Sequence, residues 1–398
     1  YCEKECRKSD YVLPKCMVYN IFLCINVNQH TRWKMKIVDL QNYVIDIPRS
    51  STLKTSYGSN ESATTVLTVI KTDTGLEGYG QGSVDAPFYG ETAESMFINI
   101  EKHIKPHIIG LDPLEHTNIL NIINKNLPFH SHTFTISGVD MALWDLKGKI
   151  LNTPLYNLLG GKINKGIELM GFVHHGSPEE MSKYSSNMCK EKNYKVLKMK
   201  IGMDPDEDLE RYKSVIESIG EKTVIQVDGN TGYCIDQAVP TLKKMEKLGK
   251  LGAVEQPVHR KCDMSVLASK LNTPIMADEA IYGPEDAIEI VKEKAASLAL
   301  MKISKHGGIT SVMNIGAIFD AAGLGLSIAI YYDLIAMAAI HLACSMKAVR
   351  WPSPATDLDD TILKDTIIEK DNMLLPTEKP GLGVDLDFDK VNKYKINI

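Results

Sequence analysis

The stretch VLKMKIGMDPDEDLERYKSVIES, residues 196–218, decides the fold class. It opens with a short β run at 196–201 and passes through a turn into an amphipathic helical segment at 206–218. The same alternation recurs from Gly161 onward, and seven helical segments separate eight β runs at residues 168–173, 196–201, 223–227, 252–255, 274–277, 298–303, 324–330 and 348–351. Strands that alternate with helices at this spacing indicate parallel βα units. The chain is therefore predicted to be α/β, with a (β/α)7β TIM-like barrel over residues 161–360.

The regions on either side of the barrel follow a different pattern. Residues 36–47, 63–71 and 76–79 are rich in Val, Ile, Leu, Thr and Tyr and predict an antiparallel meander, which helical patterns follow up to residue 150. Strands first and helices second indicate an α+β domain, so residues 35–160 are predicted to form a cap. Residues 361–398 are expected to return to this cap.

The first 34 residues lack a strand or helix period and end just before Met35. We interpret residues 1–34 as a non-native or disordered extension and Met35 as the natural start. The alternative is a signal peptide with its apolar core at 16–27, but no small-residue cleavage site follows that run.

Composition narrows the classes of function. The 398 residues carry 45 basic and 50 acidic side chains, with no basic stripe that would indicate nucleic acid. No apolar run is long enough to span a bilayer. Eight cysteines form neither a disulfide framework nor a paired CxxC site, which favours a reducing cytoplasm. We expect a cytoplasmic enzyme for a small-molecule carboxylate, acting without nucleic acid or membrane, and assembled as a homo-oligomer.

Charged residues stand at the ends of five consecutive predicted strands. They are Lys198 and Lys200, Asp228, Glu255, Asp278 and Lys302, and the steps from 200 to 302 are each about one βα unit long. Taken singly, an Asp or Glu after a strand is usually a turn residue or a helix cap, and a Lys on a strand usually points to solvent. Barrel strands have no solvent face, however, so the set requires partners, and active sites of such barrels lie at these strand ends.

The three carboxylates predict a metal site with oxygen ligands only. Asp228, Glu255 and Asp278 come from adjacent strands with no His or Cys among them, which suits Mg²⁺, with Mn²⁺ as a substitute, and disfavours zinc. Lys198 and Lys200 lie on the same face of one strand, beside that metal. We expect the cation and the neighbouring ammonium to bring a lysine pKa from about 10.4 toward neutrality.

These parts suit removal of the proton next to a substrate carboxylate. The product of that step is a dianionic enediolate, which a divalent cation and a fixed ammonium stabilise. Lys302 stands across the metal ligands from Lys200, so two acid/base groups can address opposite faces of one carbon.

The motifs as a set resemble the enolase superfamily, in its muconate lactonizing enzyme and mandelate racemase-like subgroup. The resemblance rests on Lys198-Met199-Lys200, Asp228-Gly229-Asn230, Glu255-Gln256-Pro257, Ala277-Asp278-Glu279 and Lys302 followed by Gly307-Gly308. It implies Asp228, Glu255 and Asp278 as Mg²⁺ ligands, Lys200 and Lys302 as acid/base catalysts and Lys198 as an electrostatic aid.

The substrate residues are less firmly indicated by the sequence. Asp333 stands near the position where the subgroup often carries a Glu, and Asp357 with Asp359 resembles the paired aspartates with which dipeptide epimerases hold an ammonium; a solvated turn is the alternative. Tyr331, His174 and Tyr89 are further candidates at the rim or in the cap loops, where packing is the alternative role. We expect a racemase or epimerase of an amino-acid derivative, either a dipeptide or a proline-type imino acid. The alternatives are a dehydratase of a hydroxyproline-type substrate, a muconate-type cycloisomerase and a catalytically silent metal-binding barrel.

Overall fold

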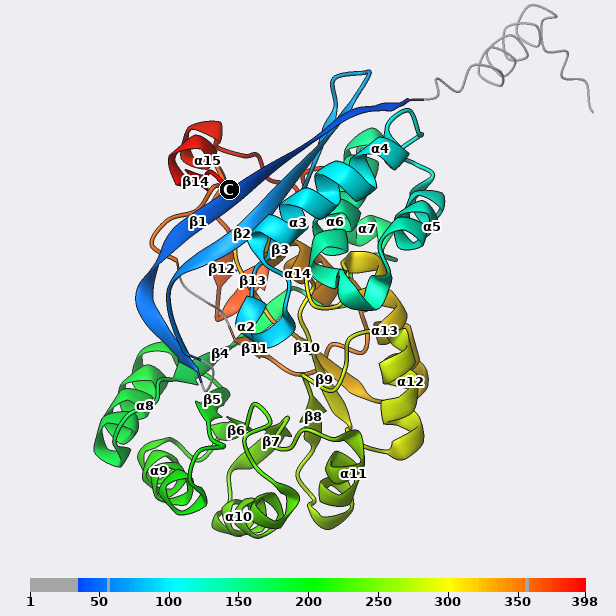
Figure 1. Ribbon diagram of the computed structural model, residues 1–398. Helices are drawn as coiled ribbons and strands as arrows, with labels where there is room; N and C mark the ends of the chain where they lie inside the picture. Colours follow the sequence, from blue (N-terminus) through cyan, green and yellow to red (C-terminus); the bar gives the residue numbers. More distant parts are fainter. Residues whose placement is uncertain (1–34, 56–57, 355–357) are drawn as a thin grey trace, which may run out of the picture. The chain divides into compact units, whose positions relative to one another are not determined.

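Parallel strands alternate with helices from residue 167 to residue 345 and build the barrel (Figure 1). The computed structural model describes residues 35–55, 58–354 and 358–398. The strands of this part are β4 (Ile167–Val173), β5 (Val196–Lys200), β6 (Val224–Asp228), β7 (Leu251–Glu255), β8 (Ile275–Ala277), β9 (Leu298–Met301) and β10 (Gly325–Ile328). The helices between and after them are α8 (Pro178–Lys192), α9 (Pro205–Ser218), α10 (Ile235–Leu248), α11 (Lys261–Lys270), α12 (Pro284–Glu293), α13 (Ile309–Ala321) and α14 (Asp333–Ser345).

Each strand pairs in parallel with the next one along the chain, from β4 to β10. The segment after α14 closes the ring, because Val349 forms a parallel bridge with Leu326 and β11 (Ser353–Pro354) pairs in parallel with β4. The predicted eighth strand at 348–351 is thus reduced to one bridge, and the regular pairing lies two residues later. Pro352 accounts for the break, since proline has no amide hydrogen for a strand ladder.

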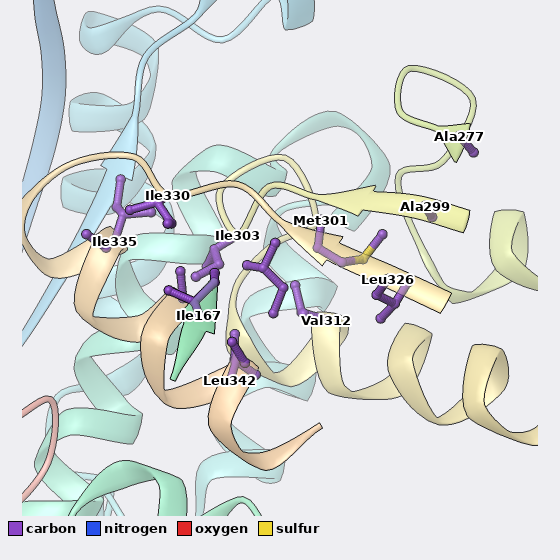
Figure 2. Close-up of a cluster of buried hydrophobic side chains, with 14 of the residues drawn as sticks. Ile167, Ala277, Ala299, Met301, Ile303, Val312, Leu326, Ile330, Ile335 and Leu342 are labelled. Atoms are coloured by element: carbon purple, nitrogen blue, oxygen red, sulfur yellow. The ribbon is translucent and has the colours of Figure 1, made fainter. Parts of the chain in front are cut away.

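Local sequence signals set the helix starts. Ser177 accepts a hydrogen bond from the amide of Glu180, whose side chain returns to the amide of Ser177, and this capping box begins α8. Asp204 caps α9 through the amides of Asp206 and Glu207. The apolar faces of the helices then pack on the strands. Figure 2 shows part of that core, where Met301 and Leu326 lie with side chains of α13 and α14.

The cap is an antiparallel sheet covered by helices. Its strands have the order β14 (Lys395–Ile396), β1 (Ile37–Thr55), β2 (Gly58–Thr72) and β3 (Glu77–Ser83). The helical elements that follow are α2 (Ala86–Tyr89), α3 (Ala93–Asn99), the π-helix η1 (Ile100–Ile104), α4 (Lys105–Ile108), α5 (His116–Asn126), the 3₁₀ turn η2 (Phe129–Ser131), α6 (Thr133–Ile150) and α7 (Leu155–Leu158). Gly80 lets α6 approach β3 closely, because a Cβ there would lie 1.9 Å from the carbonyl oxygen of Gly138.

The C-terminal residues run back from the barrel to the cap. β12 (Ile368–Lys370) and β13 (Met373–Leu375) form a hairpin whose second strand pairs with β4. The helix α15 (Phe388–Tyr394) follows, and β14 completes the cap sheet by pairing Ile396 with Val44 of β1. Among the described residues, no helix is both long and apolar enough to cross a membrane.

Hydrogen bonds tie the cap directly to the barrel rim. The amide of Ser83, at the end of β3, donates to Oγ of Ser304 at 3.0 Å. Gln81 accepts from the amide of Leu334, and Trp144 of α6 donates to Thr310 at 2.9 Å. These bonds hold the end of β3 next to the loop that carries Lys302.

Candidate active site

The strand register places three of the predicted residues in one row. Lys200 is the register partner of Asp228, and Asp228 is the register partner of Glu255. Because neighbouring residues in register present their side chains to the same face, the three ends of β5, β6 and β7 meet at one level of the barrel. Lys200 Nζ donates to Asp228 Oδ2 at 2.6 Å, and it also donates to Asn230.

Lys198 lies one layer deeper and bridges two carboxylates. Its Nζ is 3.0 Å from Asp228 Oδ2 and 2.7 Å from Glu255 Oε2. The amide of Gln226 also donates to Glu255, and Gln226 in turn accepts from Trp351 at 2.5 Å. All of these partners are buried or nearly so, which satisfies the rule that buried charges are paired.

Asp278, just after β8, is held by two lysines from the next strand end. Lys302 Nζ approaches Oδ2 at 2.6 Å, and Lys305 Nζ contacts Oδ1 at 2.7 Å and the backbone oxygen at 2.6 Å. Lys305 is 0% exposed, and burial lowers its pKa. Lys302 also donates to the hydroxyl of Tyr89 at 3.0 Å, which links the cap helix α2 to the site.

The donor set fits a hard cation, although the carboxylates are not arranged as a ready-made cluster. Among the described residues, no group of three His, Cys, Asp or Glu side chains meets as a metal site. Ammonium groups lie between the carboxylates instead. Oε1 of Glu255 and Oε2 of Glu279 are nevertheless buried and without a hydrogen-bond partner in the described structure. Unused buried carboxylate oxygens beside Asp228 and Asp278 are ligands that Mg²⁺ accepts.

Ion pairs with the carboxylates raise the pKa values of two lysines of the site, Lys198 and Lys302. Burial acts to lower the pKa of Lys198, but Asp228 and Glu255 outweigh it and raise this pKa above its usual value. Burial also acts to lower the pKa of Lys302. Asp278 and Tyr89 outweigh this effect and raise that pKa well above its usual value. The expected fall in a lysine pKa concerns the site with its cation bound, and it stays a prediction.

The surroundings shift the pKa values of the three carboxylates in different directions. Burial acts to raise the pKa of Asp228 and Asp278, yet the lysines that contact each one lower both. For Glu255, burial and then the charge of Asp228 raise the pKa. Glu255 therefore carries the least compensated charge of the three, in agreement with its unpartnered Oε1.

Lys200 and Lys302 line the same cavity, which measures about 860 Å³. Lys200 ends β5, and Lys302 directly follows β9. In the sheet order, β6, β7 and β8 separate these strands on one side, and β10, the closing segment and β4 separate them on the other. The two lysines therefore enter the cavity from opposite sides of the barrel.

The predicted substrate residues divide into two groups. Tyr331 and His174 line the cavity, and His174 packs edge-on against Phe172 with ring centroids 5.4 Å apart. Tyr89 reaches the site through Lys302. Asp333 and Asp359, by contrast, are absent from the described residues that line the cavity.

Asp333 and Asp359 make contacts away from the cavity. The Asp333 carboxylate accepts from Thr361, from the amide of Ile362 and, at 3.4 Å, from Gln81, so it joins the cap and the C-terminal segment to α14. Asp359 is exposed, and its amide donates to the backbone of Pro48. Asp357 lies outside the described residues.

Three residues that the sequence argument did not single out belong to the site. Asn230 connects Lys200 to Glu279, with its amide 2.9 Å from Glu279 Oε1. Gln226 and Lys305 hold Glu255 and Asp278 from beneath. Gln226 follows the same alternation as Asp228 on β6, so strand periodicity is a signal that would have found it, whereas Asn230 lies beyond the end of β6.

The chain forms a closed βα barrel under an α+β cap, and it carries opposed lysines and three carboxylates at the carboxyl ends of the strands. This combination defines an acid/base enzyme of the barrel class. Comparisons with known proteins agree. Residues 41–160 match the family model for the mandelate racemase / muconate lactonizing enzyme N-terminal domain, and residues 180–391 match the model described as enolase C-terminal domain-like.

Individual relatives extend this match over most of the chain. The L-Ala-D/L-Glu epimerase of Clostridium acetobutylicum is 31% identical over 88% of this chain and 99% of its own length. The N-succinyl-L-Arg/Lys racemase of Bacillus cereus is 28% identical over 91% and 98%. The crystal structure of a dipeptide epimerase from Cytophaga hutchinsonii, complexed with Mg and the dipeptide D-Ala-L-Val, has a TM-score of 0.85 at 25% identity and covers 91% of this chain and 99% of its own. The chain belongs to the enolase superfamily, in its mandelate racemase and muconate lactonizing enzyme group, and is an isomerase of that superfamily.

Proposed function

We propose that this enzyme is a magnesium-dependent racemase or epimerase of an amino-acid derivative. The observation that carries the proposal is the entry of Lys200 and Lys302 into one cavity from opposite sides of the barrel. A carbon between two such groups can lose its proton on one face and regain a proton on the other. A dehydratase would use the same pair differently, with one lysine as the base and the other as the acid that protonates the leaving hydroxyl.

The reaction balances with these two side chains alone. One lysine, as the neutral amine, takes the proton from the carbon next to the substrate carboxylate, and the electron pair of the broken C–H bond moves into an enediolate. The other lysine, as the ammonium, returns a proton to the opposite face. The product is the mirror configuration at that carbon. The first lysine ends protonated and the second ends neutral, so the reverse reaction uses the same groups in exchanged roles.

Asp228, Glu255 and Asp278 would hold the magnesium ion, and the relative from Cytophaga hutchinsonii was crystallised with Mg. When bound, the ion supplies positive charge that stabilises the enediolate oxygens and offsets the effect of the carboxylates on the lysine pKa values. Lys198, which contacts two of these carboxylates, fixes their orientation and adds a further positive charge. Mn²⁺ is expected to substitute.

The relatives support an amino-acid derivative as the substrate. Two of them are named for the epimerisation or racemisation of an amino-acid unit, one in a dipeptide and one carrying a succinyl group. The cavity of this chain carries both cationic and acidic side chains, Arg49 and Asp85 among them, which suits a zwitterion better than a purely anionic diacid such as muconate.

Exchange of the α-proton tests the proposal. The protein is incubated with Mg²⁺ in D₂O with free amino acids, their N-acyl derivatives and dipeptides, and mass spectrometry and chiral chromatography follow each compound. We expect deuterium at the α-carbon together with inversion for one class of compound. Exchange accompanied by loss of water would replace the epimerase by a dehydratase, and exchange with none of the compounds would contradict the proposal.

A further inference from the structure

Asp85 lies on the cap wall of the cavity at a helix start, but it does not act as a helix cap. It directly precedes α2, where an aspartate usually accepts a hydrogen bond from a backbone amide of the first turn. The Asp85 side chain makes no such bond, and it lines the cavity together with Lys302 and Arg49. The carboxylate is thus directed to the cavity at the expense of a local interaction.

Hydrogen bonds fix this segment against the loop that carries Lys302. The amide of Ser83 donates to Ser304, two residues after Lys302, and the amide of Val84 donates to the backbone of Thr64 at 3.0 Å. Asp85 follows immediately. Burial raises its pKa, and Lys302 and Arg49 are close enough to lower that pKa in part. Asp85 therefore faces the cavity that Lys302 also lines, on a segment bonded to the loop that carries this lysine.

The Asp85 carboxylate lacks the partners that the other acidic groups of the site possess. Asp228, Glu255 and Asp278 each accept from at least one lysine at 2.7 Å or less. Within the described residues, no hydrogen bond or ion pair reaches the side chain of Asp85. Arg49 is engaged elsewhere, since its Nε donates to the backbone of Ser62 and its guanidinium lies 5.2 Å from the ring centroid of Tyr332.

We propose that Asp85 binds the nitrogen atom attached to the reacting carbon, and that this nitrogen is a protonated primary or secondary amine. The inference rests on the proposed function, which places the reacting carbon next to Lys302 in the cavity that Asp85 also lines. A half-buried carboxylate without a partner, such as that of Asp85, is compensated by a cationic amine and only weakly by a neutral amide. The substrate class is then a free or N-alkyl α-amino acid, imino acids included, rather than an N-acyl amino acid or the C-terminal residue of a dipeptide.

Binding to matched pairs of compounds tests this assignment. Free α-amino and imino acids and the N-acetyl derivative of each are titrated by calorimetry into the full chain with Mg²⁺. We expect the tightest-binding compounds to be free amines that bind at least tenfold more tightly than their acetyl partners. Asp85→Asn keeps the size and an acceptor oxygen but removes the charge, so it should abolish that preference. Glu94→Gln, which neutralises a fully exposed carboxylate of the cap helix α3, should leave the preference unchanged.

The outcomes separate this inference from the proposed function. Three results would overturn the role of Asp85: equal or tighter binding of the acetyl partners, a preference that survives Asp85→Asn, or no binding of any free amine. Inversion of an N-acyl compound in D₂O would still support the epimerase. Conversely, Asp85-dependent binding of free amines without α-proton exchange on any compound would sustain the subsite and contradict the epimerase. Asp85→Asn should fold normally, with an unchanged or raised Tm, because the carboxylate makes no hydrogen bond that folding would lose.

Discussion

Lys200 and Lys302 are chemically alike but held by different partners, so single substitutions at each should divide the reaction. Lys200 is fixed by Asp228 and Asn230, and Lys302 by Asp278 and Tyr89. With one lysine on each face of the carbon, Lys200→Ala should lose α-proton exchange with one enantiomer and Lys302→Ala with the other. Net racemisation should fall by a factor of about 10² to 10⁴ in both.

NMR of the α-proton in D₂O, run separately on each enantiomer, measures this division. Magnesium binding should survive in both variants, because neither lysine is a proposed ligand. Full turnover in Lys302→Ala, or loss of exchange with the same enantiomer in both variants, would contradict the two-base assignment.

At the level of single residues, the sequence predicted most charged groups of the site, but it did not predict the role of Asp85 or the pKa of Lys302. Lys198, Asp228 and Glu255 were predictable because a barrel strand has no face exposed to water, so a charge on it must meet partners inside. Asp85 was missed because an aspartate before a helix normally reads as a cap. The pKa of Lys302 depends on its distance from Asp278, which strand spacing alone does not give.

At the level of elements, Asp333 connects the start of α14 to the cap and to the C-terminal segment. Its side chain accepts hydrogen bonds from the C-terminal segment and from Gln81 of β3, and its φ of 46° lies in the left-handed region. Asp333→Ala should lower the free energy of unfolding by about 1–3 kcal/mol, because buried donors lose their acceptor and alanine disfavours that backbone conformation. Urea denaturation measures the loss.

Asp333→Asn serves as the matched control for this prediction. Asparagine keeps an acceptor oxygen and tolerates a positive φ, so its cost should be clearly smaller than that of alanine. KM of either variant should stay within about twofold of the wild-type value. A normal stability with a strongly raised KM would restore the substrate-binding role that the sequence suggested for Asp333.

His341 makes the packing of α14 sensitive to acid. Its Nδ1 accepts from the amide of Tyr156 in α7, its Nε2 donates to the carbonyl of Leu382, and burial lowers its pKa to about 4. The usual histidine pKa is about 6.5. The folded protein therefore holds His341 neutral while the unfolded chain takes up a proton, so stability is full above pH 6.5 and is lost as the pH falls toward 4.

The comparison of wild type with His341→Gln isolates this contribution. Glutamine can supply both hydrogen bonds but does not titrate, so the stability advantage of the wild type should shrink by about 2–3 kcal/mol between pH 7.5 and pH 4.5. Urea unfolding at the two pH values measures it, and all other titrating groups cancel in the difference. An advantage that stays constant with pH would show that His341 has the same pKa in the folded protein as in the unfolded chain.

At the level of the whole molecule, the barrel and its cap were predictable because their strands and helices have separate periodicities. The enolase-superfamily assignment and the order of strands were confirmed. The contacts between distant segments were not predictable in the same way. Asp333 meets Gln81 of the cap, 252 residues away, and Ser83 meets Ser304, because tertiary packing and not local pattern sets these pairs.

As the proposed magnesium ligands, Asp228, Glu255 and Asp278 should make both the stability and the activity of the enzyme depend on a divalent cation. EDTA should abolish α-proton exchange and Mg²⁺ should restore it. Tm should also rise with Mg²⁺, because a ligand that binds only the folded state stabilises it by about 2.7 kcal/mol at a hundred times Kd.

Glu255→Gln should weaken the dependence of Tm on Mg²⁺. Without the cation this variant should be at least as stable as wild type, since burial raises the pKa of Glu255 and its Oε1 lacks a partner. Mg²⁺ should raise the Tm of Glu255→Gln much less than that of wild type, whereas it should raise the Tm of the surface control Glu94→Gln as much as that of wild type. An equal rise of Tm in Glu255→Gln and wild type, or full α-proton exchange in EDTA, would place the cation elsewhere.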